Sequence, residues 1–223
     1  MIYKSSTVTL KKTGNDWDLT VNWEGSKRRF WINFPFPLLK IIAQEKVGDT
    51  KKRFTIKAEK VQLLSTFIKK RKDHLDYNNA LYMLYDLGNQ LLTLERFYLG
   101  VPFLSLHDII VVENKDKIHF FYMNDEKVYN ISSSSKLMVV DTPHEKSPFL
   151  SPEMKRSNKL PITLNFKSGF YSLASLVTFS LFHKYVTLEN KDDLLAPIYT
   201  SALYWALMRM LADKPENRFY III

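Results

Sequence analysis

A serine, a histidine and an aspartate stand within one short segment, at Ser105, His107 and Asp108. These residue types form the nucleophile, the base and the orienting acid of hydrolytic triads. The next four residues, 109–112, are an apolar run typical of a strand, and adjacent residues of a strand point to opposite faces. The three side chains are therefore not expected to converge, and we assign no triad to this segment.

Metal and redox chemistry have few candidate ligands in this chain. The sequence contains no cysteine, which excludes disulfides, thiolate metal sites and cysteine nucleophiles. The histidines are dispersed along the chain without the spacing of metal ligands, at His74, His107, His119, His144 and His183. We therefore predict no metal site and no cofactor.

Basic residues are concentrated at the start of the chain. The net charge is +9, and residues 1–72 hold 17 basic and 6 acidic side chains. This asymmetry indicates an acidic partner, such as nucleic acid, an anionic membrane surface or an acidic protein, or else a solvated basic face. The candidate contacts to an anion or nucleic acid form three clusters: Lys27, Arg28 and Arg29; Lys51, Lys52 and Arg53; and Lys69, Lys70, Arg71 and Lys72.

Nucleic-acid binding by these clusters is one of the functions that the sequence leaves open. Lysine and arginine would contact phosphates, and Trp17, Trp23 or Trp31 would be available to stack on bases. No base-reading motif is present, so such binding would have weak sequence specificity.

The elements that position these residues fall into two groups. Residues 1–57 are predicted to form a small antiparallel sheet with strands at 6–10, 17–23 and 29–34 and a short helix at 38–45. In the strand 17–23, every second residue is apolar, which is the pattern of a half-buried strand. Gly14 and Gly25 fall in the intervening turns.

Residues 58–223 are predicted to form a second, mainly helical domain. Its expected helices span 58–72, 76–99, 170–186 and 195–212, with Asp76 as the N-cap and Gly100 as the C-cap of the second. A hairpin is expected at 109–123 and a further short strand at 128–131. This order makes the chain α+β.

Three segments of this second domain resemble the C-lobe of a protein kinase. Residues 149–154 (FLSPEM) resemble the "APE" element, and residues 167–176 (KSGFYSLASL) resemble the start of the long buried helix. Residues 211–218 (LADKPENR) resemble the closing "D-P-x-x-R". The resemblance covers residues 75–223 and implies a protein-kinase-like fold with a reduced N-terminal antiparallel sheet lobe and a mainly helical C-lobe.

The positions that perform kinase chemistry do not match. A kinase needs a glycine-rich loop, a lysine on the third strand, a catalytic aspartate and two metal-holding side chains. Residues 1–34 contain no G-x-G-x-x-G pattern, and the expected third strand, 29–34, has no lysine. The resemblance places the degenerate catalytic, metal-holding and loop-bracing positions at Phe103, Leu104, Ser105, Asp108, Tyr122 and Gly169.

One structural feature of kinases is retained. Glu153 and Arg218 match the glutamate and the final arginine that form a buried ion pair in kinases. A retained scaffold with unmatched catalytic positions predicts a pseudokinase that binds no nucleotide and serves as a protein-binding scaffold or a structural or regulatory factor. Exposed aromatic residues would form its interface, with Trp17, Trp31, Phe34 and Phe36 as candidates.

Two further inferences concern origin and location. The loop 103–112 and the segment 149–153 look like those of kinase-like proteins of large DNA viruses, which implies a viral factor or a virion component. The sequence has no signal-peptide run and no apolar stretch of about 18 residues. We therefore expect an intracellular protein, in cytoplasm, nucleus or virion interior, that is not secreted. An atypical phosphotransferase that uses Asp108 and Asp125 is the remaining alternative.

Overall fold

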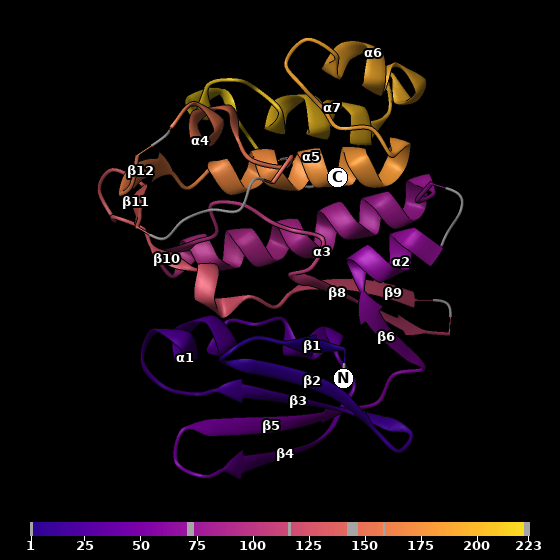
Figure 1. Ribbon diagram of the computed structural model, residues 1–223. Coiled ribbons are helices and arrows are strands. Elements are labelled where there is room, and N and C mark those ends of the chain that lie inside the picture. Colours follow the sequence, from indigo (N-terminus) through magenta and orange to yellow (C-terminus); the bar gives the residue numbers. More distant parts are fainter. Residues whose placement is uncertain (1, 71–73, 116, 142–146, 158, 221–223) are drawn as a thin grey trace.

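The computed structural model describes residues 2–70, 74–115, 117–141, 147–157 and 159–220. Figure 1 shows that the start of the chain forms a sheet-rich part, drawn in indigo and violet, and that the rest forms a larger, mainly helical part. The architecture is mixed α+β, as predicted.

The sheet-rich part is built on a five-stranded antiparallel sheet with the order β1-β2-β3-β5-β4. Its buried face is set by register, because Leu10 pairs with Leu19, which pairs with Phe54, and all three are buried. The predicted strands at 6–10 and 17–23 are confirmed as β2 and β3. The strands are β1 Tyr3–Lys4, β2 Val8–Thr13, β3 Asp16–Asn22, β4 Ile41–Val47 and β5 Lys51–Ile56.

The predicted strand at 29–34 is wrong, because this segment belongs to helix α1, Gly25–Ile32. Phe30 and Trp31 are adjacent and both are buried, whereas a strand would point them to opposite faces. Phe34 follows the C-cap of this helix, Asn33, and its ring lies on the same side as Phe30. The three aromatic rings pack against one another there.

The predicted helix at 38–45 is also wrong. Its residues form the end of a 3-10 turn, η1 (Phe36–Leu38), and most of strand β4. The spacing of Leu38, Ile41 and Ile42 fits a helical face, but β5 offers a free edge to pair with, and β4 takes it. Sheet pairing thus overrides the local helical pattern.

The helical part contains its own strands. Strands β6 Lys60–Leu63, β8 Ile109–Asn114 and β9 Lys117–Tyr122 form an antiparallel sheet in the order β6-β8-β9, which confirms the hairpin. Two short pairs are β7 Leu99–Gly100 with β10 Tyr129–Asn130, and β11 Leu137–Val140 with β12 Ile162–Asn165. The expected helix at 58–72 is wrong over its first turn, where β6 pairs with β8.

Helices α3 and α5 pack side by side at the centre of this part (Figure 1). Asp76 caps α3 as predicted by accepting a hydrogen bond from the Asn79 backbone N–H at 2.8 Å. Gly100 is not the C-cap, because α3 ends at Arg96 and Gly100 lies in β7. The helices are α2 Leu64–Lys70, α3 Tyr77–Arg96, α4 Pro152–Arg156, α5 Ser168–Phe182, α6 Lys191–Leu195 and α7 Ala202–Met210, with 3-10 turns η2 Asp125–Lys127, η3 Ala196–Ile198 and η4 Pro215–Asn217.

The predicted helix at 195–212 starts late, because residues 196–198 form η3 and α7 begins only at Ala202. Within the part of the chain that the structure describes, no helix has the length and apolar character needed to cross a membrane.

Candidate functional site

The loop at the kinase catalytic position, residues 101–108, connects β7 to β8 and is packed into the interior. Phe103, Leu104 and Ser105 are all buried. The Leu104 backbone N–H donates a hydrogen bond of 2.8 Å to the Ser172 hydroxyl on α5. The three positions that the resemblance aligns with H-R-D therefore hold two apolar core residues and a serine, and no carboxylate.

Ser105, His107 and Asp108 have separate partners. The His107 ring Nδ1 lies 3.3 Å from the Ser65 hydroxyl, and Asp108 accepts a hydrogen bond of 2.7 Å from the Asn124 amide. Ser105 accepts a hydrogen bond from the backbone N–H of His107, not from its ring. This arrangement agrees with the expectation that the three side chains do not act as a triad.

The segment after β9 holds the polar side chains that follow Tyr122, the residue that the resemblance aligns with the metal-holding aspartate of kinases. Tyr122 lies in the core, where burial and then the negative charge of Asp108 raise the pKa of its phenol. Asn124 follows, caps η2 by accepting from the Glu126 backbone N–H, and donates to Asp108. Asn124 therefore both starts the 3-10 turn η2 and holds it to Asp108.

Asp125 joins the sheet part to the helical part. Only 1% of the residue is exposed. Its carboxylate accepts hydrogen bonds from the Thr7 hydroxyl and from the Trp31 indole N–H, the latter at 2.8 Å. Its backbone carbonyl accepts a bond of 2.6 Å from the Lys27 ammonium. We call this contact of Thr7, Trp31, Lys27 and Asp125 the junction.

Burial raises the pKa of the Asp125 carboxyl above its usual value of 3.8, although the hydrogen bonds from Thr7 and Trp31 and the charge of Lys27 oppose this rise. Next to it, Glu126 accepts hydrogen bonds from the backbone N–H and the hydroxyl of Ser6. Both carboxylates thus serve to hold the start of β2 against the helical part.

Trp17 closes the other side of the sheet part. Its indole N–H donates a hydrogen bond of 3.0 Å to the Ala58 carbonyl, in the linker between β5 and β6. The ring is buried and lies at the end of β3 that pairs with Ile56. The Ala58 carbonyl of the linker therefore already accepts a hydrogen bond from a side chain of the protein itself, Trp17.

The predicted basic clusters lie on three separate elements, α1, β5 and α2 (Figure 1). Part of their charge serves internal contacts. Arg29 donates to the Phe97 carbonyl at 2.5 Å, Arg53 pairs with Glu45 at 2.8 Å, and the Lys52 ammonium lies 4.5 Å from the centre of the Trp23 ring. Arg71 and Lys72 lie outside the described residues.

The expected aromatic contacts are mostly wrong. Trp17 and Trp31 are buried, so neither can stack on a base, and only Trp23 is partly exposed. Phe34 is buried as well, and Phe36 is partly buried against the core. Burial removes Trp17, Trp31 and Phe34 from the interface that the sequence indicated. The Trp31 and Phe34 rings pack with Phe30 of α1, and Phe34 stacks on Phe121 of the β8–β9 hairpin.

Glu153 and Arg218 form the pair that the sequence predicts. Two parallel hydrogen bonds of 2.7 Å join the guanidinium to the two carboxylate oxygens. Arg218 is completely buried, and its remaining donors reach the carbonyls of Ala212 and Asp213. The Ser168 hydroxyl, at the start of α5, also donates to Glu153 at 2.7 Å.

Gly169 stands where kinases carry an aspartate that braces the catalytic loop. A Cβ atom at this position would lie 2.4 Å from the Val101 carbonyl oxygen. The close approach of helix and loop thus leaves no room for a side chain. The loop is still held to α5, because Ser172, one turn later, accepts from Leu104. The sequence indicates that the contact made by the kinase aspartate is lost at Gly169, and in the structure the Ser172 hydroxyl holds the loop instead.

Replacing Asp125 with alanine is expected to lower the free energy of unfolding by about 1–2 kcal/mol. The change leaves the buried Trp31 indole N–H without its acceptor, and the loss is partly offset because a carboxylate is no longer buried. Urea unfolding at neutral pH measures the effect. Asp125→Asn keeps an acceptor oxygen and is the matched control; equal losses in both variants would contradict the role given to the hydrogen bonds.

No protein-family model matches the sequence, and no curated protein matches it. Among solved structures, the chain is similar to the autoinhibited serine kinase domain of the giant muscle protein titin, with a TM-score of 0.63 and 12% sequence identity. The alignment covers 98% of this chain and 74% of that chain. At this identity the likeness establishes the fold, which is protein-kinase-like, with an antiparallel sheet part followed by a mainly helical part.

Proposed function

We propose that this chain is a catalytically inactive kinase-like protein, a pseudokinase, that acts as a protein-binding scaffold or regulatory factor. The fold supports a kinase scaffold. The side chains at the expected catalytic positions support the absence of phosphoryl transfer, since Phe103, Leu104 and Ser105 supply no carboxylate to accept a proton.

The observation that carries this proposal is the direct contact between Thr7 and Asp125. In kinases the phosphate-covering loop belongs to the first strands and the metal-holding aspartate follows the hairpin, so the phosphates lie between them. In this chain, the corresponding segments before β2 and after β9 are joined by a hydrogen bond. Strand β3, with the sequence DWDLTVN, also supplies no lysine to pair with phosphate.

The atypical phosphotransferase is less well supported by the same contacts. A phosphotransferase of this kind would need the carboxylates of Asp108 and Asp125 to be free to bind the metal ions of a bound nucleotide. The Asp125 carboxylate accepts from Thr7 and Trp31, and Asp108 accepts from Asn124 and lies 3.4 Å from the Lys127 ammonium. A viral role also remains part of the proposal, on the resemblance of the loop 103–112 and the segment 149–153.

Millimolar ATP with magnesium is expected to leave the melting temperature of the protein unchanged. A nucleotide at a hundredfold excess over its Kd would stabilise the native state by about 2.7 kcal/mol. For a domain of this size that corresponds to a rise of roughly 5–10 °C. Differential scanning fluorimetry measures the shift, with an active protein kinase as the positive control.

A rise of several degrees that requires magnesium would contradict the proposal. The variant Thr7→Val provides a matched test, because it removes the hydroxyl that reaches Asp125 while keeping the shape of the side chain. If wild type is unaffected by ATP and Thr7→Val is stabilised by it, the junction excludes the nucleotide. If neither responds, the missing phosphate-binding groups are sufficient to explain the absence of binding.

A further inference from the structure

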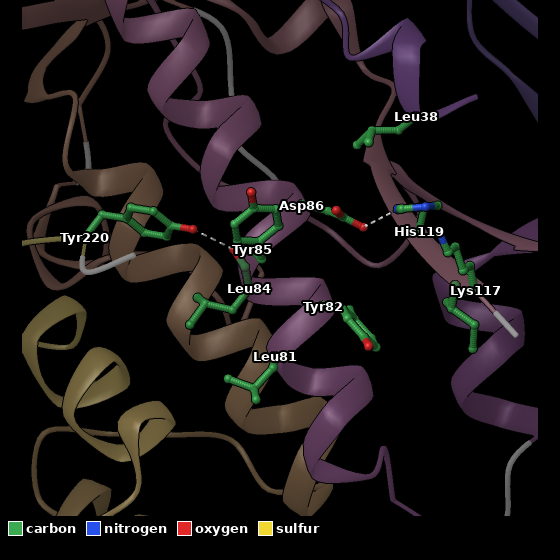
Figure 2. A pocket seen from close by; sticks show the side chains of 10 residues that line it. Leu38, Leu81, Tyr82, Leu84, Tyr85, Asp86, Lys117, His119 and Tyr220 are labelled. Atoms are coloured by element: carbon green, nitrogen blue, oxygen red, sulfur yellow. Dashed lines mark hydrogen bonds and ion pairs between the residues drawn. The ribbon is translucent and has the colours of Figure 1, made fainter. Parts of the chain in front are cut away.

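An apolar groove is formed by η1 of the sheet part together with α3, β9 and the C-terminal segment of the helical part. Its volume is about 480 Å³, within the range of about 300–1,000 Å³ that is common for binding sites. Figure 2 shows Tyr82 and Asp86 of α3 on the side of β9, and Leu81 and Leu84 on the side of Tyr220. The apolar and aromatic residues that line it are Leu38, Leu81, Tyr82, Leu84, Tyr85, Ile118 and Tyr220.

Large apolar side chains are left exposed in this groove. Leu38 is 41% exposed, Tyr82 54% and Tyr85 49%. Exposed apolar residues gathered in a hollow mark a binding surface more strongly than the same residues scattered singly. They come from both parts of the chain, Leu38 from the sheet part and the two tyrosines from α3, so the groove depends on how the two parts are assembled.

Two polar groups at the wall of the groove, the Asp86 carboxylate and the Tyr220 hydroxyl, are already paired. Asp86 is buried and accepts hydrogen bonds from the Phe120 backbone N–H at 3.0 Å and lies 3.2 Å from the His119 ring Nδ1 (Figure 2). The Tyr220 hydroxyl donates to the Leu84 carbonyl at 3.2 Å. These contacts leave the open surface of the groove mainly apolar, so an occupant gains by burying apolar side chains.

A second hollow of about 660 Å³ adjoins the groove at Lys117, which lines both. Glu59 is the one acidic residue among the described residues that line it, and its carboxylate accepts a hydrogen bond from the Lys115 backbone N–H. Among the described residues, no carboxylate forms an ion pair with any lysine of this hollow. The lysines are Lys12, Lys40, Lys57, Lys115 and Lys117.

We propose that this groove binds an acidic amphipathic segment of a partner protein, whose apolar side chains enter the groove while its carboxylates face the adjoining lysines. This inference rests on the proposed scaffold function and names the site and the chemistry of its partner. Charge complementarity selects the acidic partner, because the uncompensated lysines would repel a basic segment. An apolar groove gives no gain to a simple polyanion, so the two features together favour a peptide over nucleic acid.

The probe is a fluorescein-labelled synthetic helix with leucine and phenylalanine on one face and glutamate on the other. Two matched peptides carry lysine in place of glutamate, or serine in place of the apolar residues. Fluorescence anisotropy with the full chain should give the acidic amphipathic peptide a Kd at least tenfold lower than either matched peptide. Equal affinity for the acidic peptide and its serine version would overturn the proposal and indicate charge attraction alone.

Exposed positions allow variants that leave the core intact. Tyr82→Ser in the groove, and Lys40→Glu with Lys117→Glu beside it, should each weaken binding of the acidic amphipathic peptide at least tenfold. The controls are Tyr199→Ser, an exposed tyrosine elsewhere, and Lys51→Glu with Lys69→Glu, which change the charge equally. Equal losses in the variants and their controls would refute the groove, and competition by single-stranded RNA would assign the lysines to nucleic acid.

A capture experiment separates failure of the groove from failure of the scaffold function. Tagged wild type and Tyr82→Ser are incubated with nuclease-treated extract of the native cells. If both capture the same proteins, the scaffold function holds and the groove proposal is wrong. If neither captures any protein, the scaffold function fails, while the peptide measurement still decides what the groove binds.

Discussion

Replacing Arg218 with alanine is expected to lower the free energy of unfolding by about 3–5 kcal/mol. The guanidinium is completely buried and donates to both oxygens of Glu153. It also donates to the Ala212 and Asp213 carbonyls, which lie just before it in the chain. Its loss strands a partly buried carboxylate and two carbonyls, and chemical denaturation with wild type as reference measures the cost.

The double variant Glu153→Leu with Arg218→Leu is the control for this prediction. Replacing a buried ion pair by apolar residues of similar volume is often nearly neutral, so the double variant should be more stable than Arg218→Ala. If the double variant were as unstable as Arg218→Ala, packing and not the stranded charge would explain the loss. If Arg218→Ala were as stable as wild type, the ion pair would have no role in holding α4 to the end of the chain.

The stability lost in Arg218→Ala should also depend on pH. Burial alone would raise the pKa of the Glu153 carboxyl, but the hydrogen bonds from Arg218 and Ser168 and the charge of Arg218 outweigh it and hold the pKa below 4.5. A carboxyl with a lowered native pKa stabilises the native state above its unfolded pKa and ceases to do so as pH falls through the native pKa. The difference between wild type and Arg218→Ala should therefore shrink below about pH 4.5.

The sequence was sufficient to predict the main elements of the helical part, α3, the β8–β9 hairpin and α5, because each reflects a local requirement, but it did not predict β6, β11 or β12. Asp76 begins α3 because its side chain can accept a hydrogen bond from the first turn, and the continuous apolar run at 109–112 is typical of a buried, paired strand. Glu153 and Arg218 were linked by resemblance, and their contact in the structure joins residues 65 positions apart. Periodicity alone could not have identified that pair.

The junction could not be predicted, because each of its partners looks ordinary in its own segment. Asp125 reads as a turn residue, and its bonds to Thr7 and Trp31 span 118 and 94 positions. Trp31 was assigned to a strand and to an exposed interface. Only the placement of α1 against the loop after β9 turns its indole inward. The wrong strand at 29–34 and the unpredicted junction therefore have the same cause, the placement of α1 against the loop after β9.

The groove could not be predicted from the sequence either, because its residues come from segments that are far apart in the chain. Tyr82 and Tyr85 are exposed on α3, and nothing in the sequence distinguishes them from the buried residues of the same helix. Leu38 was assigned to a helix that does not exist. The lysines beside the groove come from four places in the chain, since Lys115 and Lys117 are two residues apart, and all five lie outside the basic clusters that the sequence indicates. The charge of these lysines and the exposure of these apolar side chains indicate a binding site only when the fold brings them together.

Replacing Gly169 with alanine is expected to destabilise the protein by about 3 kcal/mol, near the upper end of the usual cost of overpacking. The added Cβ would lie 2.4 Å from the Val101 carbonyl oxygen. That oxygen belongs to the backbone, so it cannot turn away as a side chain would. The buried Phe103 and Leu104 that follow it restrict movement of the loop. Gly169→Asp, which introduces the residue that the kinase resemblance implies, should be less stable still.

The sign of the change in the free energy of unfolding tests whether the added Cβ clashes with the Val101 carbonyl. Alanine favours a helix over glycine by about 1 kcal/mol, so without the clash Gly169→Ala would stabilise α5. Thermal or urea unfolding therefore distinguishes the two cases by direction as well as by size. A loss in Ser172→Ala, which removes the acceptor of the Leu104 N–H, would confirm that α5 holds the loop through that hydroxyl. A stabilised Gly169→Ala would mean that α5 and the loop are not in contact, and that the brace assigned to Ser172 is absent as well.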